Sequence, residues 1–181
     1  MENTTEIDQL KYPIGRYVKE DHYSDAELDT LISIIELAPE KYESIVSKLV
    51  LEDWTKTYRP GGWNVLQLIH HVADIQMLHF LRMKKVLTEP DYKEVTLIDM
   101  DSWVATPDGI SAPPEDSITM FRGITRRYVF LLRSLTENDL RIEYYHPVRK
   151  YMINQAQAIA MSAWHVRHHL EHIKIATGIT R

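Results

Sequence analysis

The 181-residue sequence contains no cysteine. This absence excludes a thiol nucleophile, a disulfide framework and a thiolate metal site, so any metal must be held by histidine, carboxylate, amide or water ligands. Two other features are missing. No hydrophobic run approaches the ~18 residues of a membrane span, and Met1 to Leu10 lack the apolar core of a signal peptide. The net charge of −5 gives no reason to expect nucleic acid or an anionic membrane as partner. We therefore expect a cytoplasmic protein that has neither nucleic acid nor a membrane as partner.

Length and patterning predict one helical domain over residues 1–181. Apolar residues recur at helical spacing in four stretches, and Ser24 with Glu27 forms a capping-box signature before the first of them. The expected segments are an N-terminal arm (1–23), a first helix from Ser24 that Pro39 ends or bends, helices at 64–87, 114–135 and 154–176, a long connecting segment (89–115) and a short hairpin or extended crossover (136–153). Four helices joined by one or two long crossovers predict an all-α four-helix bundle.

Four of the nine histidines lie between Trp164 and His172. His165 and His169 are one helical turn apart on a flank of the expected last helix, so both imidazoles can bind one divalent metal ion. On the second helix His71 borders the apolar face, whereas His70 lies about 100° further round, away from the core. His71 is therefore the better candidate for a third ligand. The pattern predicts a metal site inside a helical bundle.

The remaining polar candidates carry open alternatives. His168 is rotated further outward than His169, and His172 lies beside His165 on the helical wheel. His79 falls at the centre of the apolar stripe, where we expect a core histidine that is hydrogen-bonded to a neighbour. His146 either lines a substrate pocket or is simply exposed. Asp74 either orients a ligand imidazole or is a solvated helix charge.

Five motifs occur in an order that resembles one known family. They are Tyr12-Pro13-Ile14-Gly15, Tyr58-Arg59-Pro60-Gly61-Gly62-Trp63, His70-His71-Val72-Ala73-Asp74, Tyr145-His146-Pro147 and Trp164-His165 with His168-His169 and His172. The chain resembles the YfiT-like branch of the DinB superfamily, whose members are described as metal-dependent hydrolases and linked to bacillithiol transferase activity. The resemblance implies a DinB-type four-helix bundle, a homodimer, and one zinc or nickel ion bound by His71, His165 and His169. Many superfamily members have Gln where this chain has His172, which leaves His172 as either a supporting residue or an alternative ligand.

Three histidines leave coordination positions open, which is typical of catalytic rather than structural zinc. Such a metal generates either a hydroxide for hydrolysis of an amide or ester, or a thiolate from a substrate thiol for S-transfer. The sequence does not choose between a hydrolase and a thiol S-transferase of the bacillithiol type. A non-catalytic metal-binding or stress-response protein and a purely structural metal are the alternatives.

The general base is not obvious from the sequence, and the candidates near the ligands are Asp74, His172 and, with less support, Glu171. We expect the substrate pocket to be walled by the 89–115 segment, by residues 144–146 and by residues 12–17 of the arm. Arg59 or Arg149 is a candidate for binding a substrate carboxylate, although exposed arginines are common.

Overall fold

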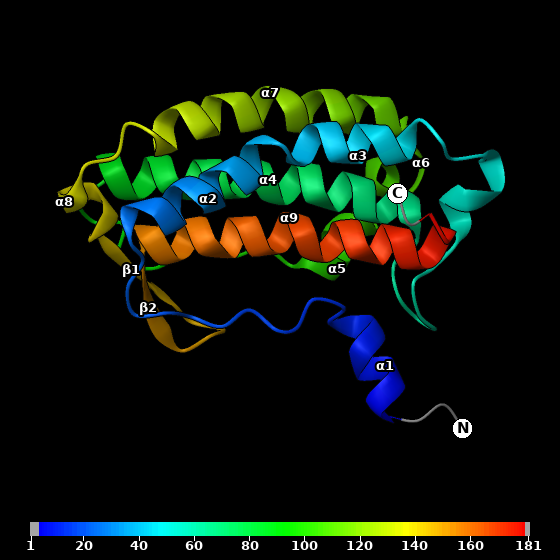
Figure 1. Ribbon diagram of the computed structural model, residues 1–181, viewed down its shortest axis with the longest axis horizontal. Helices are drawn as coiled ribbons and strands as arrows, with labels where there is room; N and C mark the ends of the chain where they lie inside the picture. Colours follow the sequence, from blue (N-terminus) through cyan, green and yellow to red (C-terminus); the bar gives the residue numbers. More distant parts are fainter. Residues whose placement is uncertain (1–3, 180–181) are drawn as a thin grey trace.

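The structure is a computed structural model that describes residues 4–179, with side chains from residue 6. Its body is a bundle of long helices that lie side by side (Figure 1). The first position of the bundle is occupied by two consecutive helices, α2 (Asp25–Glu36) and α3 (Ala38–Val46). The other three positions are occupied by α4 (Val65–Thr88), α7 (Pro114–Leu132) and α9 (Gln155–Thr177). Helix α4 packs against both α7 and α9, and α2 also packs against these two. The predicted all-α four-helix bundle is confirmed.

Local signals in the sequence set the ends of these helices. Ser24, Asn64 and Asn154 each accept a hydrogen bond from the backbone N–H three residues later, in a capping box with Glu or Gln. At the other end of α9, Gly178 adopts a left-handed conformation with φ of 73°, which a residue with a Cβ atom adopts less readily. Pro39 lies in the first turn of α3, where its missing N–H is tolerated, and the chain bends there.

Short elements occupy the connections. They are α1 (Thr4–Lys11), the 3₁₀ helix η1 (Leu51–Thr55), α5 (Met100–Val104), α6 (Pro107–Ser111), α8 (Glu137–Leu140), β1 (Glu143–His146) and β2 (Tyr151–Asn154). The two strands form an antiparallel hairpin in which Glu143 pairs with Asn154. The long 89–115 segment thus contains two helices, both packed against α4. Helix α7 ends at Leu132 rather than at the predicted Leu135.

The core divides into two apolar clusters along the bundle. The cluster at the hairpin end includes Ile35, Tyr128 and Ile159, and the other includes Tyr42 and Phe121. Burying each such side chain contributes about 1.5–3 kcal/mol. The hydroxyl of Tyr42 donates to the backbone carbonyl of Val166 over 2.8 Å, which anchors α3 to α9. The bundle therefore has an apolar core that is distinct from its histidines.

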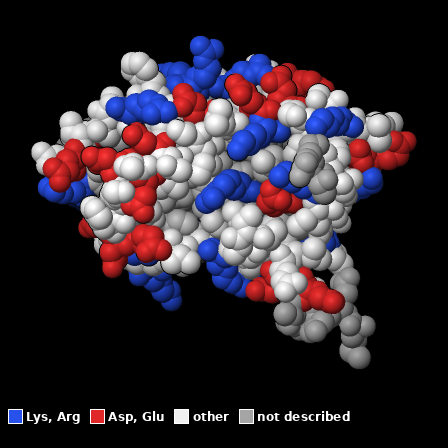
Figure 2. All heavy atoms as spheres, viewed as in Figure 1, with Lys and Arg blue, Asp and Glu red and all other residues white. Residues whose placement is uncertain are grey.

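The outer surface is mixed in charge. Acidic and basic side chains are both scattered over the face shown in Figure 2. No helix within residues 4–179 is long and apolar enough to cross a membrane. Residues 12–24 of the N-terminal arm run alongside α9, and α1 lies beyond them (Figure 1). Residues 1–3 of the predicted arm lie outside the described residues.

Candidate metal centre

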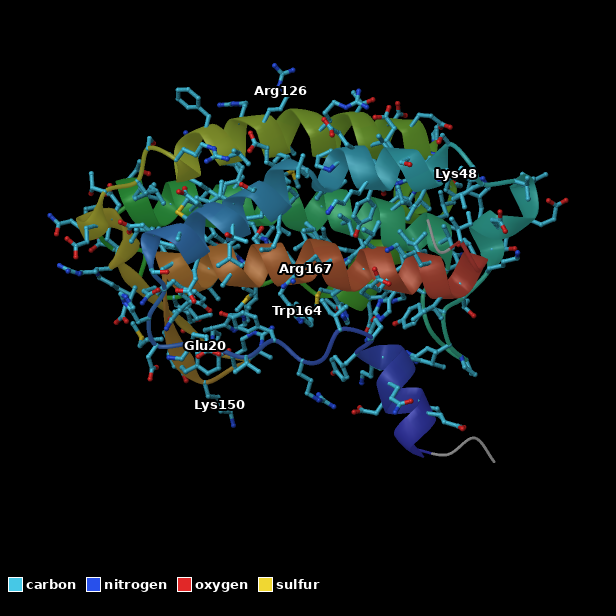
Figure 3. The ribbon with its side chains drawn as sticks, in the orientation of Figure 1. Glu20, Lys48, Arg126, Lys150, Trp164 and Arg167 are labelled. Carbon is cyan, nitrogen blue, oxygen red and sulfur yellow. The ribbon has the colours of Figure 1, made fainter. Side chains whose placement is uncertain are left out.

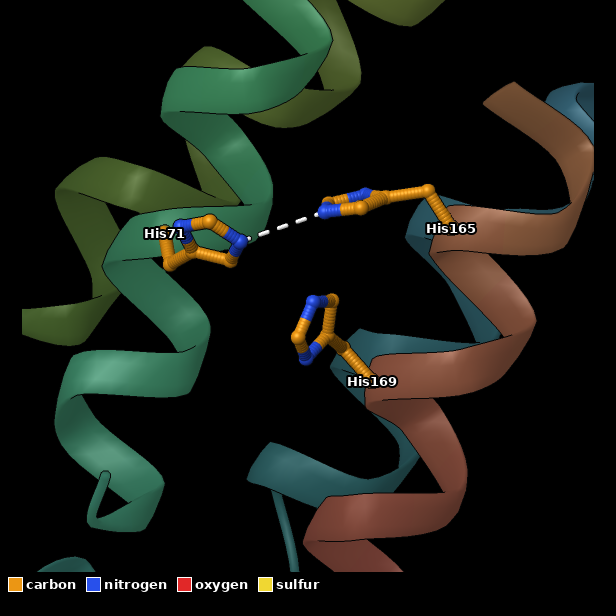
Figure 4. Close-up of side chains that lie close together, drawn as sticks. All are labelled: His71, His165 and His169. Carbon is orange, nitrogen blue, oxygen red and sulfur yellow. Dashed lines mark hydrogen bonds between the residues drawn. The ribbon is translucent and has the colours of Figure 1, made fainter. Parts of the chain in front are cut away.

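Three histidines converge between α4 and α9. His71 projects from α4, and His165 and His169 project from successive turns of α9 toward it (Figure 4). One ring nitrogen of each lies within 4.8 Å of one ring nitrogen of the other two. The Nε2 atoms of His71 and His165 are 3.2 Å apart. The structure thus brings together the three residues that the sequence predicts as ligands.

His172 fixes the orientation of His169. Its Nε2 lies 3.2 Å from the backbone carbonyl of Lys11, which can only accept, so this nitrogen carries the proton and donates. The Nδ1 of a neutral His172 is then an acceptor, and the Nδ1–H of His169, 3.3 Å away, donates to it. His169 is left with an unprotonated Nε2 for the cluster. This is the arrangement by which supporting residues set the tautomer of a metal-binding histidine.

Aromatic rings cover the site. The Trp63 ring lies 4.6 Å from that of His71 and 6.3 Å from that of His169, and its Nε1–H donates to Asp101 over 3.2 Å. The Tyr58 ring stacks on that of His172 at 3.8 Å. Both aromatics belong to the turn that leads into α4. Their role beside the histidines is not predicted from the sequence, although their position in a turn before the His71 helix was a usable signal.

The electrostatics of the cluster suit a cation with neutral ligands. Burial, with a smaller contribution from His172, lowers the pKa of His71 to about 3. Burial and the neighbouring imidazoles also hold the pKa values of His165 and His169 well below the usual value. All three rings are therefore neutral at pH 7 and expose lone pairs. Because two nitrogens 3.2 Å apart share at most one proton, the cluster is electron-rich, and its donor set fits a divalent zinc or nickel ion.

A second histidine cluster shares His169. The ligand atoms of His168, His169 and His172 also lie within 4.8 Å of one another. However, the His168 ring is stacked against Trp164 at 4.3 Å and against Tyr12 at 6.0 Å. All three residues are buried. This cluster is closed, whereas His165 of the first cluster is partly exposed to a cavity.

Two predictions of side-chain direction are wrong. His70 is 5% exposed instead of pointing away from the core, because α6 and α7 cover that flank of α4 and its Nδ1 lies 2.7 Å from the Ser117 hydroxyl. His168 is 6% exposed instead of facing outward, because the N-terminal arm lies over it with the Tyr12 ring. In both cases a segment from elsewhere in the chain buries a flank of the helix that the sequence pattern of the helix predicts to be exposed.

A cavity of about 290 Å³ adjoins His165. It is lined by Ile75, Leu78, His79, Arg82, Leu97, Ile98, Met100, His146, Val148, Arg149, Met161, Trp164 and His165. The 89–115 segment and the hairpin thus contribute to the wall, as predicted, and His146 lines the pocket although it is only 8% exposed. The predicted contribution of residues 12–17 of the arm is wrong, because none of them lines the cavity. The arm instead contacts a wall residue, since its Gly15 carbonyl accepts from Trp164 Nε1 over 3.1 Å.

His79 lines the cavity close to the cluster. Its ring is 5.8 Å from that of His165, and burial, then Arg82, lowers its pKa to about 3. It is half-buried, and no hydrogen bond to a neighbour is found for it within residues 4–179. The expected core histidine with a hydrogen bond to a neighbour is instead a wall residue of the cavity.

The other polar candidates lie outside the cluster. Burial, then Asp108, raises the pKa of Asp74 to about 6. No hydrogen bond joins Asp74 to the three histidines in the described part of the chain, so its role stays a prediction. Glu171 pairs with Lys174 at 2.7 Å. The Arg59 guanidinium lies 5.3 Å from the Tyr58 ring and donates to the carbonyl of Pro60.

The fold and the cluster define the class of protein: a four-helix bundle with a cluster of potential metal-ligating histidines between two of its helices. The model of the DinB superfamily matches residues 34–173. The chain belongs to this superfamily.

Known relatives narrow the comparison. A protein of Bacillus pumilus named "Putative metal-dependent hydrolase" is 36% identical over 164 residues, which cover 91% of this chain and 93% of the relative. YfiT of Bacillus subtilis, which carries the same description, is 33% identical over 91% of this chain and 92% of its own. The solved structure of YfiT superposes with a TM-score of 0.88 at 32% identity, covering 92% of this chain and 94% of that one. It is described as having "an unusual four-helix bundle topology".

Proposed function

We propose that this protein is a metal-dependent enzyme that acts on a small molecule. The observation that carries the proposal is the convergence of three neutral imidazoles, His71, His165 and His169, from two helices. Their donor set fits one zinc or nickel ion per chain. Three protein ligands leave positions open for water or substrate, as in catalytic sites.

A divalent ion bound there supplies Lewis acidity, which activates a water or a thiol as nucleophile and polarises a carbonyl. The chain's own residues prepare this chemistry. His172 holds His169 in the tautomer that presents Nε2. Trp63 covers His71 and His169 and excludes water from that side. Of the three cluster histidines, His165 alone lines the cavity in the described part of the chain, so the reacting molecule approaches from its side.

Hydrolysis of an amide or ester is the first reaction to test. The descriptions of the Bacillus relatives support it. S-transfer from a low-molecular-weight thiol of the bacillithiol type is the second candidate. The observation that favours S-transfer is that no carboxylate within residues 4–179 is hydrogen-bonded to the three histidines and so placed as a general base. A thiol activated by a metal needs no strong protein base. In that reaction the thiol gives its proton to solvent water, its sulfur bonds to the electrophilic carbon, and the bond from that carbon to the leaving group breaks, with the electron pair going to the leaving group.

The experiment is elemental analysis of untagged protein and of His71→Ala. We expect about one zinc or nickel ion per wild-type chain, and little or none in the variant. His22→Ala, at an exposed histidine, is the control and keeps its metal. Loaded protein is then assayed with ester and amide substrates, and with thiol and electrophile pairs. Metal absent from wild type after reconstitution would refute the metalloenzyme. Metal without turnover on either panel would favour the non-catalytic metal-binding or stress-response protein.

The predicted homodimer and cytoplasmic location belong to the same proposal. Size-exclusion chromatography with light scattering tests the homodimer directly. A mass near twice the 21.3 kDa of one chain is expected.

A further inference from the structure

The cavity beside His165 combines two cations with apolar walls. Arg82 from α4 and Arg149 from the turn of the hairpin both line it. Its lining contains no Asp or Glu. Most of the remaining wall is apolar, and three apolar side chains at it stay exposed: Leu97 (41%), Met100 (49%) and Val148 (72%).

Neither guanidinium has an anionic partner in the described part of the chain. Arg82 is half-buried, and its Nε and Nη2 donate to the backbone carbonyl of Thr96 over 2.9 and 2.6 Å. Those bonds hold the guanidinium in place without neutralising it. The Arg149 guanidinium lies 5.7 Å from the Tyr17 ring.

The half-buried charge of Arg82 is costly unless an anion compensates it, whereas Arg149 is exposed and free to turn toward such an anion. Charge-assisted bonds from a planar guanidinium to a carboxylate are among the strongest that proteins make. We propose that this cavity binds the substrate through a carboxylate, which Arg82 and Arg149 hold, while an apolar part of the molecule lies along Leu97, Met161 and Trp164. The volume of about 290 Å³ lies just below the range for small-molecule sites, roughly 300–1,000 Å³, and so suits a small ligand.

The inference rests on the proposed function, since it treats the cavity as the approach to the metal centre. It narrows the substrate to a small carboxylic acid whose reactive group is at the end of the molecule near His165. Arg149 was a candidate for binding a carboxylate from the sequence alone, whereas Arg82 lies in the middle of a helix and carried no such signal.

The test is binding of 4-phenylbutyrate and of its uncharged amide, measured by calorimetry on metal-free protein. Removing the metal excludes direct coordination of the carboxylate. The acid is expected to bind wild type about tenfold or more tighter than the amide. In Arg149→Gln, an exposed position, this preference should fall to about twofold or less, and Arg82→Gln should do the same. Arg126→Gln is the matched control, because Arg126 projects from α7 on the side away from Trp164 (Figure 3); its preference should match that of wild type.

The outcomes separate the two proposals. Equal binding of acid and amide by wild type, or an unchanged preference in Arg149→Gln, overturns the carboxylate site even if the protein binds zinc. If wild type prefers the acid over the amide but elemental analysis finds no metal after reconstitution, the carboxylate site is supported and the metalloenzyme is refuted. Because Arg82→Gln also removes the bonds to Thr96, its melting temperature is measured, and Arg82→Lys, which keeps the charge, should retain part of the preference.

Discussion

His172 offers the sharpest test of how the metal centre is built. In His172→Phe an aromatic ring of similar shape still stacks on Tyr58, but both hydrogen bonds of the imidazole are removed. The Nδ1–H of His169 then stays buried without an acceptor, which costs about 1–3 kcal/mol. Loss of such a supporting partner typically lowers metal affinity about 10- to 100-fold, or roughly 1.4–2.7 kcal/mol. The cost of the unpaired N–H and the free energy of the lost metal affinity are therefore of the same size.

Competition with a chromophoric zinc chelator measures the affinity. We expect His172→Phe to bind zinc about 10- to 100-fold more weakly at unchanged stoichiometry. His172→Gln, whose amide oxygen can accept from His169, should recover most of the affinity. His22→Phe changes an exposed histidine and should match wild type.

Two results would refute this reasoning. An affinity within about twofold of wild type in His172→Phe would mean that the hydrogen bond does not position His169. Complete loss of zinc in both His172→Phe and His168→Ala would mean that the closed cluster of His168, His169 and His172 is the metal site. The melting temperature of each metal-free variant shows whether the fold has survived.

Three further predictions concern stability. Metal-free protein should lose stability as the pH falls from about 6.5 toward 3. The histidines of the unfolded chain take up protons in this range, whereas buried histidines of the folded state such as His71, with its pKa of about 3, do not. Each such histidine contributes about 1.4 kcal/mol per pH unit to the loss, and urea unfolding at several pH values checks the slope. Asp74→Asn should raise the melting temperature at pH 8 but not at pH 4, because burial raises the pKa of this carboxyl to about 6 and its ionisation above that pH destabilises the folded state; an equal shift at both pH values would contradict this. Ile159→Ala, at a fully buried position in the hairpin-end cluster, should lower the free energy of unfolding by about 2–5 kcal/mol and leave zinc affinity unchanged.

Local physics made the helices and the candidate ligands predictable. The capping residues Ser24, Asn64 and Asn154 bond to the backbone three residues later, so the start of each helix can be predicted from a short stretch of sequence. The helical period likewise places His165 and His169 on one flank, one turn apart. That information is sufficient for the fold class and for the histidine cluster.

The tertiary structure decided what covers each flank. Helical geometry gives the angle of a side chain around its own axis, but burial depends on which distant segment packs there, as α6 and α7 do over His70 and the Tyr12 ring does over His168. The Nε2 of His172 likewise bonds to the backbone carbonyl of Lys11, which is 161 residues away in the sequence.

The cavity was likewise a product of packing. It forms only because the 89–115 segment and the hairpin meet α4 and α9 around Arg82, which the sequence alone shows as an ordinary helix charge. The sequence by itself therefore determined the four helices and the histidines available to a metal. The packing of non-local segments, which no local period encodes, decided the tautomer of His169, the closed second cluster and the charged cavity beside His165.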